Sequence, residues 1–75
     1  MRNQTQWAAW IRETPQSEIL EIRLWECDDS FRWYDESGAD TEVSGATEES
    51  AIEAALEAWR TWGIQIIDLR EGIES

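Results

Sequence analysis

Hydrophobic residues recur at helical spacing near the start of the chain, over residues 3–13. Trp7, Trp10 and Ile11 are three and four positions apart, which places them on one face of a helix. Pro15 follows this run, and proline ends helices because it lacks the backbone N–H and clashes with the preceding turn. The pattern predicts a short amphipathic N-terminal helix.

From residue 18 the period of the pattern changes to two, as in a strand with one buried face. One face of this expected strand is aliphatic, and the other is charged and aromatic. The two faces carry Leu20, Ile22 and Leu24 on one side and Glu21, Arg23 and Trp25 on the other. The alternation predicts a half-buried strand.

Two further strands follow, each introduced by turn residues. Asp28 and Asp29 form a plausible two-residue turn, which leads into strand-forming residues 31–35. This hairpin sets Leu24 opposite Trp33 and Trp25 opposite Arg32, so its apolar faces agree. Ser37-Gly38 is a second turn signal, and residues 41–43 return as a third strand with Val43 on the core face.

The clearest helix begins after Thr47, a good N-cap that is followed by two acidic residues which complement the helix dipole. Its expected apolar stripe is Ile52, Ala55, Leu56, Trp59 and Trp62. Gly63 is a natural stop. Residues 64–69 are almost continuously apolar, which is typical of an interior parallel strand.

These elements predict an α+β fold: a short N-terminal helix, a three-stranded antiparallel meander, one main helix packed on the sheet, and a final strand. The order is α-β-β-β-α-β, in one compact domain over residues 1–75. A right-handed crossover would place the last strand parallel beside the first, giving the sheet order 4-1-2-3. The pattern leaves open whether the first helix packs at the exposed end of the sheet or beside the main helix.

Charge is concentrated in one part of the sequence. The 75 residues include 17 Asp and Glu against six Arg, with no Lys or His, for a net charge of −11. Residues 26–57 hold eleven acids and one Arg, a net charge of −10, whereas the flanks together carry −1. Such a molecule repels nucleic acid and anionic membranes and attracts basic proteins.

The expected helix also carries a ladder of like charges. Glu49, Glu53 and Glu57 follow one another at i,i+4, about 6 Å apart, and each like-charged pair costs about 0.2–0.5 kcal/mol. The fold does not require that arrangement, and the spacing is similar to the phosphate repeat of a nucleic-acid strand. The predicted partner-binding residues are Asp28, Asp29, Glu36, Asp40, Glu42, Glu48, Glu49, Glu53 and Glu57.

A second candidate surface lies on the other face of the expected sheet, which would display Arg23, Trp25, Arg32 and Tyr34. Trp, Tyr and Arg dominate binding hot spots. This face is a partner site only if the N-terminal segment leaves it open. The alternative is that Trp7 and Trp10 pack there.

Catalytic and metal-binding patterns are missing from the sequence. One Cys and no His disfavour zinc, and the acids do not follow the spacing of a calcium loop. The sequence holds no nucleophile–His pattern, phosphate loop or dinucleotide motif. We expect no enzyme activity, no metal and no cofactor.

The sequence therefore predicts a small acidic binding protein that presents carboxylates to a basic surface of a partner, which is itself a nucleic-acid-binding protein or complex. A phage anti-defence or anti-CRISPR-type inhibitor that mimics nucleic acid is one example. The alternative is an adaptor or assembly protein that binds through its aromatic and Arg face, with the acids serving solubility or salt adaptation. We expect a cytoplasmic monomer or homodimer that binds neither nucleic acid nor membrane directly.

Overall fold

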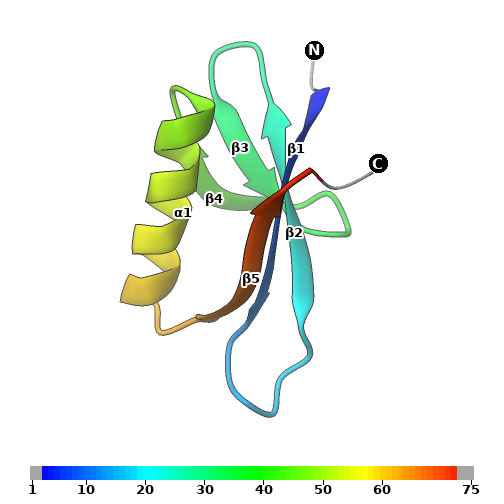
Figure 1. Cartoon of the computed structure of the whole chain (residues 1–75), viewed down its shortest axis with the longest axis vertical. Helices are drawn as coiled ribbons and strands as arrows, with labels where there is room; N and C mark the ends of the chain where they lie inside the picture. Colours follow the sequence, from blue (N-terminus) through cyan, green and yellow to red (C-terminus); the bar gives the residue numbers. More distant parts are fainter. Residues whose placement is uncertain (1–2, 73–75) are drawn as a thin grey trace.

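The computed structural model describes residues 3–72, which form a five-stranded antiparallel sheet with one helix packed on one face (Figure 1). In chain order the elements are β1 (Asn3–Arg12), β2 (Leu20–Glu26), β3 (Phe31–Tyr34), β4 (Asp40–Gly45), α1 (Glu48–Thr61) and β5 (Gln65–Glu71). In space the strands follow the order β4-β3-β2-β1-β5. Within residues 3–72 the molecule therefore has two layers, and the second face of the sheet carries no helix.

The predicted N-terminal helix is wrong, because this segment forms β1, the longest strand. The apolar residues of this segment fit the helical period as well as the strand period of two. In the strand, Ala9 and Ile11 point towards the core, while Ala8 and Trp10 point to the opposite face. β1 lies between β2 and β5, and both Ala8 and Ala9 are fully buried. Hydrogen bonding of β1 to both neighbouring strands therefore decides its structure, although three of its hydrophobic residues have helical spacing.

The predicted sheet order 4-1-2-3 is also wrong. β5 lies antiparallel to β1 at the sheet edge, with Ala9 opposite Leu69, and not parallel beside β2. This error follows from the wrongly predicted N-terminal helix. With β1 not recognised as a strand, β2 was the apparent neighbour of β5. Because β1 occupies that position, α1 connects the two edge strands across the whole width of the sheet.

The hairpin of β2 and β3 has the predicted register. Leu24 pairs with Trp33 and Trp25 pairs with Arg32, and the backbone N–H of Cys27 donates to the Ser30 carbonyl across the turn. Val43 is buried on the core face, as predicted, although a register shift in β4 accompanies a positive φ of 66° at Glu42.

The predicted caps of α1 are confirmed. Thr47 is the N-cap, and its hydroxyl accepts from the backbone N–H of Ser50 at 3.1 Å. The Ser50 hydroxyl accepts from the Thr47 N–H at 2.9 Å, so a serine completes the reciprocal box that usually ends in Glu or Gln. Gly63, with a φ of 74°, follows the last turn.

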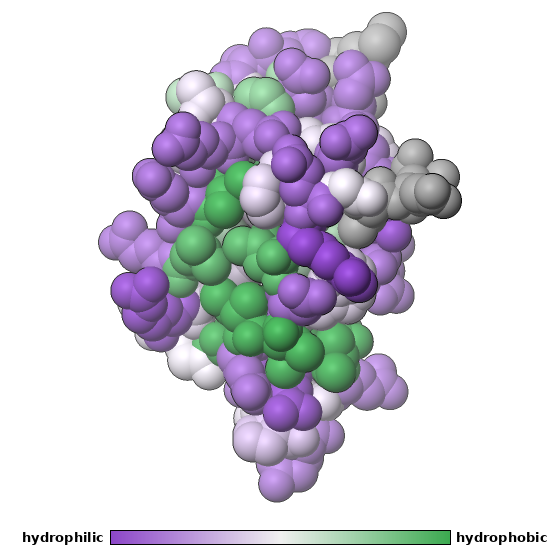
Figure 2. All heavy atoms as spheres, in the orientation of Figure 1, coloured by the Kyte–Doolittle hydropathy of each residue, from purple (hydrophilic) through white to green (hydrophobic). Residues whose placement is uncertain are grey.

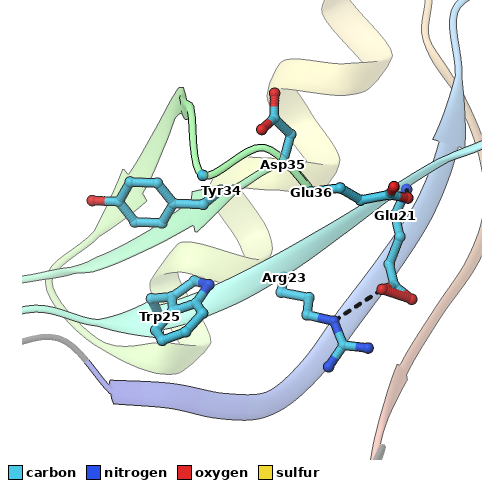
Figure 3. A pocket seen from close by; sticks show the side chains of 7 residues that line it. Glu21, Arg23, Trp25, Tyr34, Asp35 and Glu36 are labelled. Atoms are coloured by element: carbon cyan, nitrogen blue, oxygen red, sulfur yellow. Dashed lines mark hydrogen bonds and ion pairs between the residues drawn. The ribbon is translucent and has the colours of Figure 1, made fainter. Parts of the chain in front are cut away.

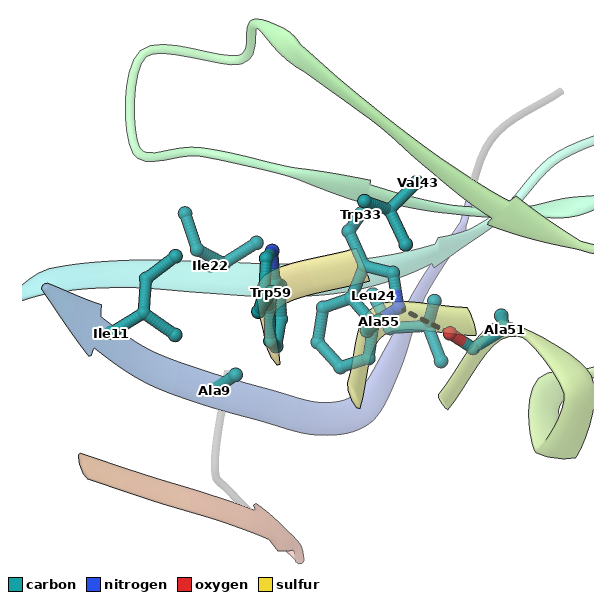
Figure 4. Close-up of a cluster of buried hydrophobic side chains, with 9 residues drawn as sticks. All are labelled: Ala9, Ile11, Ile22, Leu24, Trp33, Val43, Ala51, Ala55 and Trp59. Carbon is teal, nitrogen blue, oxygen red and sulfur yellow. Dashed lines mark hydrogen bonds between the residues drawn. The ribbon is translucent and has the colours of Figure 1, made fainter. Parts of the chain in front are cut away.

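The core lies between α1 and the sheet, and two Trp side chains dominate it (Figure 4). Trp33 of β3 and Trp59 of α1 meet edge to face, with 5.5 Å between ring centroids. The Trp33 indole N–H donates to the Ala51 carbonyl at 2.9 Å, so the ring is fixed to the helix. The other buried core residues are Ala9, Ile11, Ile22, Leu24, Val43, Ala51 and Ala55.

Gly45 allows α1 to begin close to β4. A Cβ atom at this position would collide with the backbone N of Ala51 and the carbonyl carbon of Ser50. The helix consequently lies nearer β4 and β3 than β5. Figure 2 shows hydrophobic side chains at the surface between α1 and β5. Ile66 and Leu69 of β5 are partly buried and pack against the core.

A pair of matched substitutions tests this core. Trp33→Phe removes the hydrogen bond to α1 and leaves a cavity, so we expect a loss of about 1–3 kcal/mol in the free energy of unfolding. Trp62→Phe is the control, because this ring is 55% exposed, and the loss should stay within about 0.5 kcal/mol. Urea denaturation followed by circular dichroism measures both, and equal losses would contradict this core assignment.

Candidate functional site

The sheet face opposite α1 is the first candidate surface, and the register of the strands defines it. Trp25 pairs with Arg32, and Arg23 pairs with both Tyr34 and Ala8. Residues paired across an antiparallel ladder project to the same face. The four predicted residues of the aromatic face therefore lie together, and we call this surface the open face. Trp10, Arg12, Asp68 and Arg70 join it from β1 and β5 by the same alternation.

The open face collects most of the positive charge, with four of the six arginines. Three of them bind acids on the same face: Arg23 with Glu21 at 3.0 Å, Arg32 with Asp40 at 3.1 Å, and Arg70 with Asp68 at 3.4 Å. The hydrogen bond to Asp40 raises the pKa of Arg32. These pairs make the open face nearly neutral, although the molecule carries −11.

Aromatic rings and guanidinium groups also pack against one another on this face. The Arg70 guanidinium lies over the Trp10 ring, 4.8 Å from its centroid. A cation–π contact at an exposed position contributes about 0.5–1 kcal/mol. Arg70 and Trp10 thus pack together on the sheet face opposite α1.

A hollow of about 410 Å³ opens on this face between β2 and the turn that joins β3 to β4. This volume is within the range of about 300–1,000 Å³ of ligand pockets. Its lining residues are Glu21, Arg23, Trp25, Tyr34, Asp35, Glu36 and Gly38. Figure 3 shows the rings of Trp25 and Tyr34 on one side of the hollow and the side chains of Glu21 and Glu36 on the other.

The turn beside the hollow is fixed by Asp35. One carboxylate oxygen accepts from the Ser37 hydroxyl at 2.6 Å, the Ser37 N–H at 2.9 Å and the Ala39 N–H at 3.0 Å. The Ser37 hydroxyl and then the Ala39 N–H lower the pKa of Asp35, so it is ionised at neutral pH. Glu36 reaches from the turn to β2 and accepts from the Glu21 N–H at 3.3 Å.

The predicted acidic ladder lies on the outer face of α1. Glu49, Glu53 and Glu57 are all exposed, on the side of the helix opposite buried Ala51 and Ala55. None of the three forms an ion pair with any residue in the range 3–72. We refer to these three side chains as the ladder.

The other predicted acidic residues are divided among several places. Asp28 and Asp29 are exposed in the β2–β3 turn, and Glu42 is exposed on edge strand β4. Glu36 lines the hollow, at the opposite end of β3 from the β2–β3 turn. The nine residues do not form one continuous patch.

Two of the predicted binding carboxylates also form hydrogen bonds within the fold. Glu48 accepts from the indole N–H of Trp7 at 2.9 Å and thereby ties β1 to the start of α1. Asp40 accepts from Arg32 and also from the Glu42 N–H at 2.8 Å, within the irregular part of β4.

Sequence reasoning missed Glu21 and Asp35 as parts of a site. Glu21 was recognisable, because strand alternation sets it on the same face as Arg23 and Trp25. Asp35 carried no such signal, since its position depends on the path of a five-residue turn.

Searches of protein-family models, curated proteins and solved structures found no match for this chain. Among residues 3–72 no three Cys, Asp or Glu side chains are grouped as metal ligands would be. The one helix described is too short and too polar to cross a membrane. The open face and the ladder are the two surfaces on which a function of this chain can rest.

Asp35 gives a pH-dependent test of the turn. Its lowered pKa means that it stabilises the folded state fully above its ordinary value of 3.8, and that this contribution is lost as pH falls through the lower folded value. Asp35→Ala should therefore reduce the free energy of unfolding at pH 7, and the difference from the parent protein should shrink at strongly acidic pH. Urea denaturation at both pH values checks this. A difference that is independent of pH would contradict the role of the charge.

Proposed function

We propose that this protein acts by binding rather than by catalysis, and that the ladder on α1 engages a basic, nucleic-acid-binding surface of a partner protein. The observation that supports this most strongly is the exposure of Glu49, Glu53 and Glu57 in a row, none of which forms an ion pair within residues 3–72. Successive members are about 6 Å apart along the helix axis. A basic groove that binds phosphates offers the complementary charge pattern.

The distribution of charge between the two faces supports the same proposal. Four arginines lie on the open face, and on α1 Arg60 stands near the C-terminal end. If the acidic residues served only solubility or salt tolerance, the arginines would not need to lie together on the opposite face. Segregation leaves most of the negative charge of the ladder unneutralised, which speeds encounter with a basic partner.

Charge reversal at the ladder tests the proposal. Glu49→Lys, Glu53→Lys and Glu57→Lys in one variant should lower affinity for a captured nucleic-acid-binding partner by at least about tenfold, because three attractive pairs become repulsive. The control variant carries Glu13→Lys, Glu18→Lys and Glu71→Lys, which are exposed and change the net charge equally.

The measurement is an affinity capture from host lysate, followed by titration of the purified partner at low and high salt. Both salt and competing nucleic acid should release the partner from the parent protein and from the control variant. Equal losses in the two variants would show that only net charge matters, and full retention by the ladder variant would contradict the proposal.

An adaptor that binds through the open face is a second candidate, and the hollow between Trp25 and Glu36 favours it. Its binding would depend mainly on aromatic packing, so it would persist at high salt. Trp25→Ala would abolish binding through the open face, whereas the triple Lys variant of the ladder would bind normally.

A further inference from the structure

We propose that the hollow on the open face binds one arginine side chain, supplied by the basic partner. The inference rests on the proposed function and adds a second point of contact to it, on the face opposite the ladder. The hollow is an open depression of about 410 Å³, and its lining includes two aromatic rings, three carboxylates and the guanidinium of Arg23.

The charge of the lining favours a cation. Glu21 and Arg23 bind each other at 3.0 Å and so largely neutralise one another. Asp35 and Glu36 remain as negative charges, and only one oxygen of each accepts a hydrogen bond from a described residue. Figure 3 shows the Asp35 carboxylate pointing away from the rings, so Asp35 attracts a cation electrostatically without contacting it. Glu36 has one carboxylate oxygen that accepts no hydrogen bond from a described residue, so we assign it as the carboxylate that receives the incoming group.

The shape of the lining favours a guanidinium over an ammonium. Trp25 and Tyr34 project from neighbouring strands and stand across the hollow from Glu36 (Figure 3). A guanidinium is planar, stacks on aromatic rings and donates two parallel hydrogen bonds to a carboxylate, whereas an ammonium is a compact and strongly hydrated charge. An arginine between the rings and Glu36 would use both properties.

The neighbouring surface suits the rest of a partner segment. A second, shallower depression of about 210 Å³ adjoins the hollow and shares Glu21, Asp35 and Glu36 with it. Leu20, which is 42% exposed, lines this depression. An extended segment could place its arginine in the hollow and an apolar residue on Leu20.

The test titrates the isotopically labelled protein with Nα-acetyl-arginine methylamide and follows amide and indole signals by NMR. The Gly38 amide and the Trp25 indole should shift and saturate in the millimolar range, while the amides of the ladder should not move. The matched citrulline derivative keeps the shape and lacks the charge, so it should produce no saturable shift. The lysine derivative should bind several-fold more weakly.

Two variants with the same change of charge locate the site. Glu36→Gln should weaken binding of the arginine derivative about two- to fivefold, the loss typical of one exposed ion pair. Glu53→Gln, on the ladder, should leave it unchanged. Equal binding of the citrulline or lysine derivative, no saturable shift at Gly38 and Trp25, or equal effects of the two variants would each overturn the inference.

The outcome is separable from that of the proposed function. Binding of the arginine derivative without capture of a basic partner would refute the proposed function alone. Capture of a partner through the ladder, with no response in the hollow, would refute this inference alone.

Discussion

The contact of Trp33 with Trp59 and α1 is the interaction on which the arrangement of the molecule depends. Trp33 is fully buried, meets Trp59 edge to face, and donates its indole N–H to the Ala51 carbonyl. Because Gly45 admits the helix at close range, this contact holds α1 over β3 and β4. Among residues 3–72 one helix packs on the sheet, and the opposite face carries arginine and tryptophan side chains of the strands instead.

Local patterns in the sequence predicted the elements whose partners are close along the chain. The β2–β3 hairpin follows from period-two alternation around Asp28-Asp29, and α1 follows from Thr47, Gly63 and its apolar positions. The topology was not accessible in the same way. Residues 3–12 satisfy both helical and strand spacing, and only their pairing with β2 and β5, up to more than 60 residues away in sequence, selects the strand.

The candidate site shows the same division between local and distant information. Strand alternation was sufficient to place Arg23, Trp25, Arg32 and Tyr34 on one face, and helical spacing was sufficient to place the ladder on another. The contacts of Glu48 with Trp7 and of Glu36 with the β2 backbone join residues that are far apart in the chain, so sequence spacing gave no indication of them. The acidic region from 26 to 57 is thus one segment in sequence and several surfaces in space.

This separation gives the two faces different physical characters. The outer surface of α1 has long-range negative potential with few directional contacts, which suits fast, salt-sensitive association. The open face is nearly neutral and carries rings, guanidinium groups and a hollow, which suit short-range recognition of a specific side chain. Both characters require that α1 cover one face of the sheet and leave the other uncovered.

An aromatic-resolved NOESY spectrum tests that requirement most directly. We expect cross-peaks from the Trp33 ring to Ala51, Ala55 and Trp59, together with cross-strand peaks between Ala9 and Leu69. The rings of Trp25 and Tyr34 should show no cross-peaks to residues 48–61. Contacts between those rings and α1, or helical contacts within residues 3–12, would contradict that requirement.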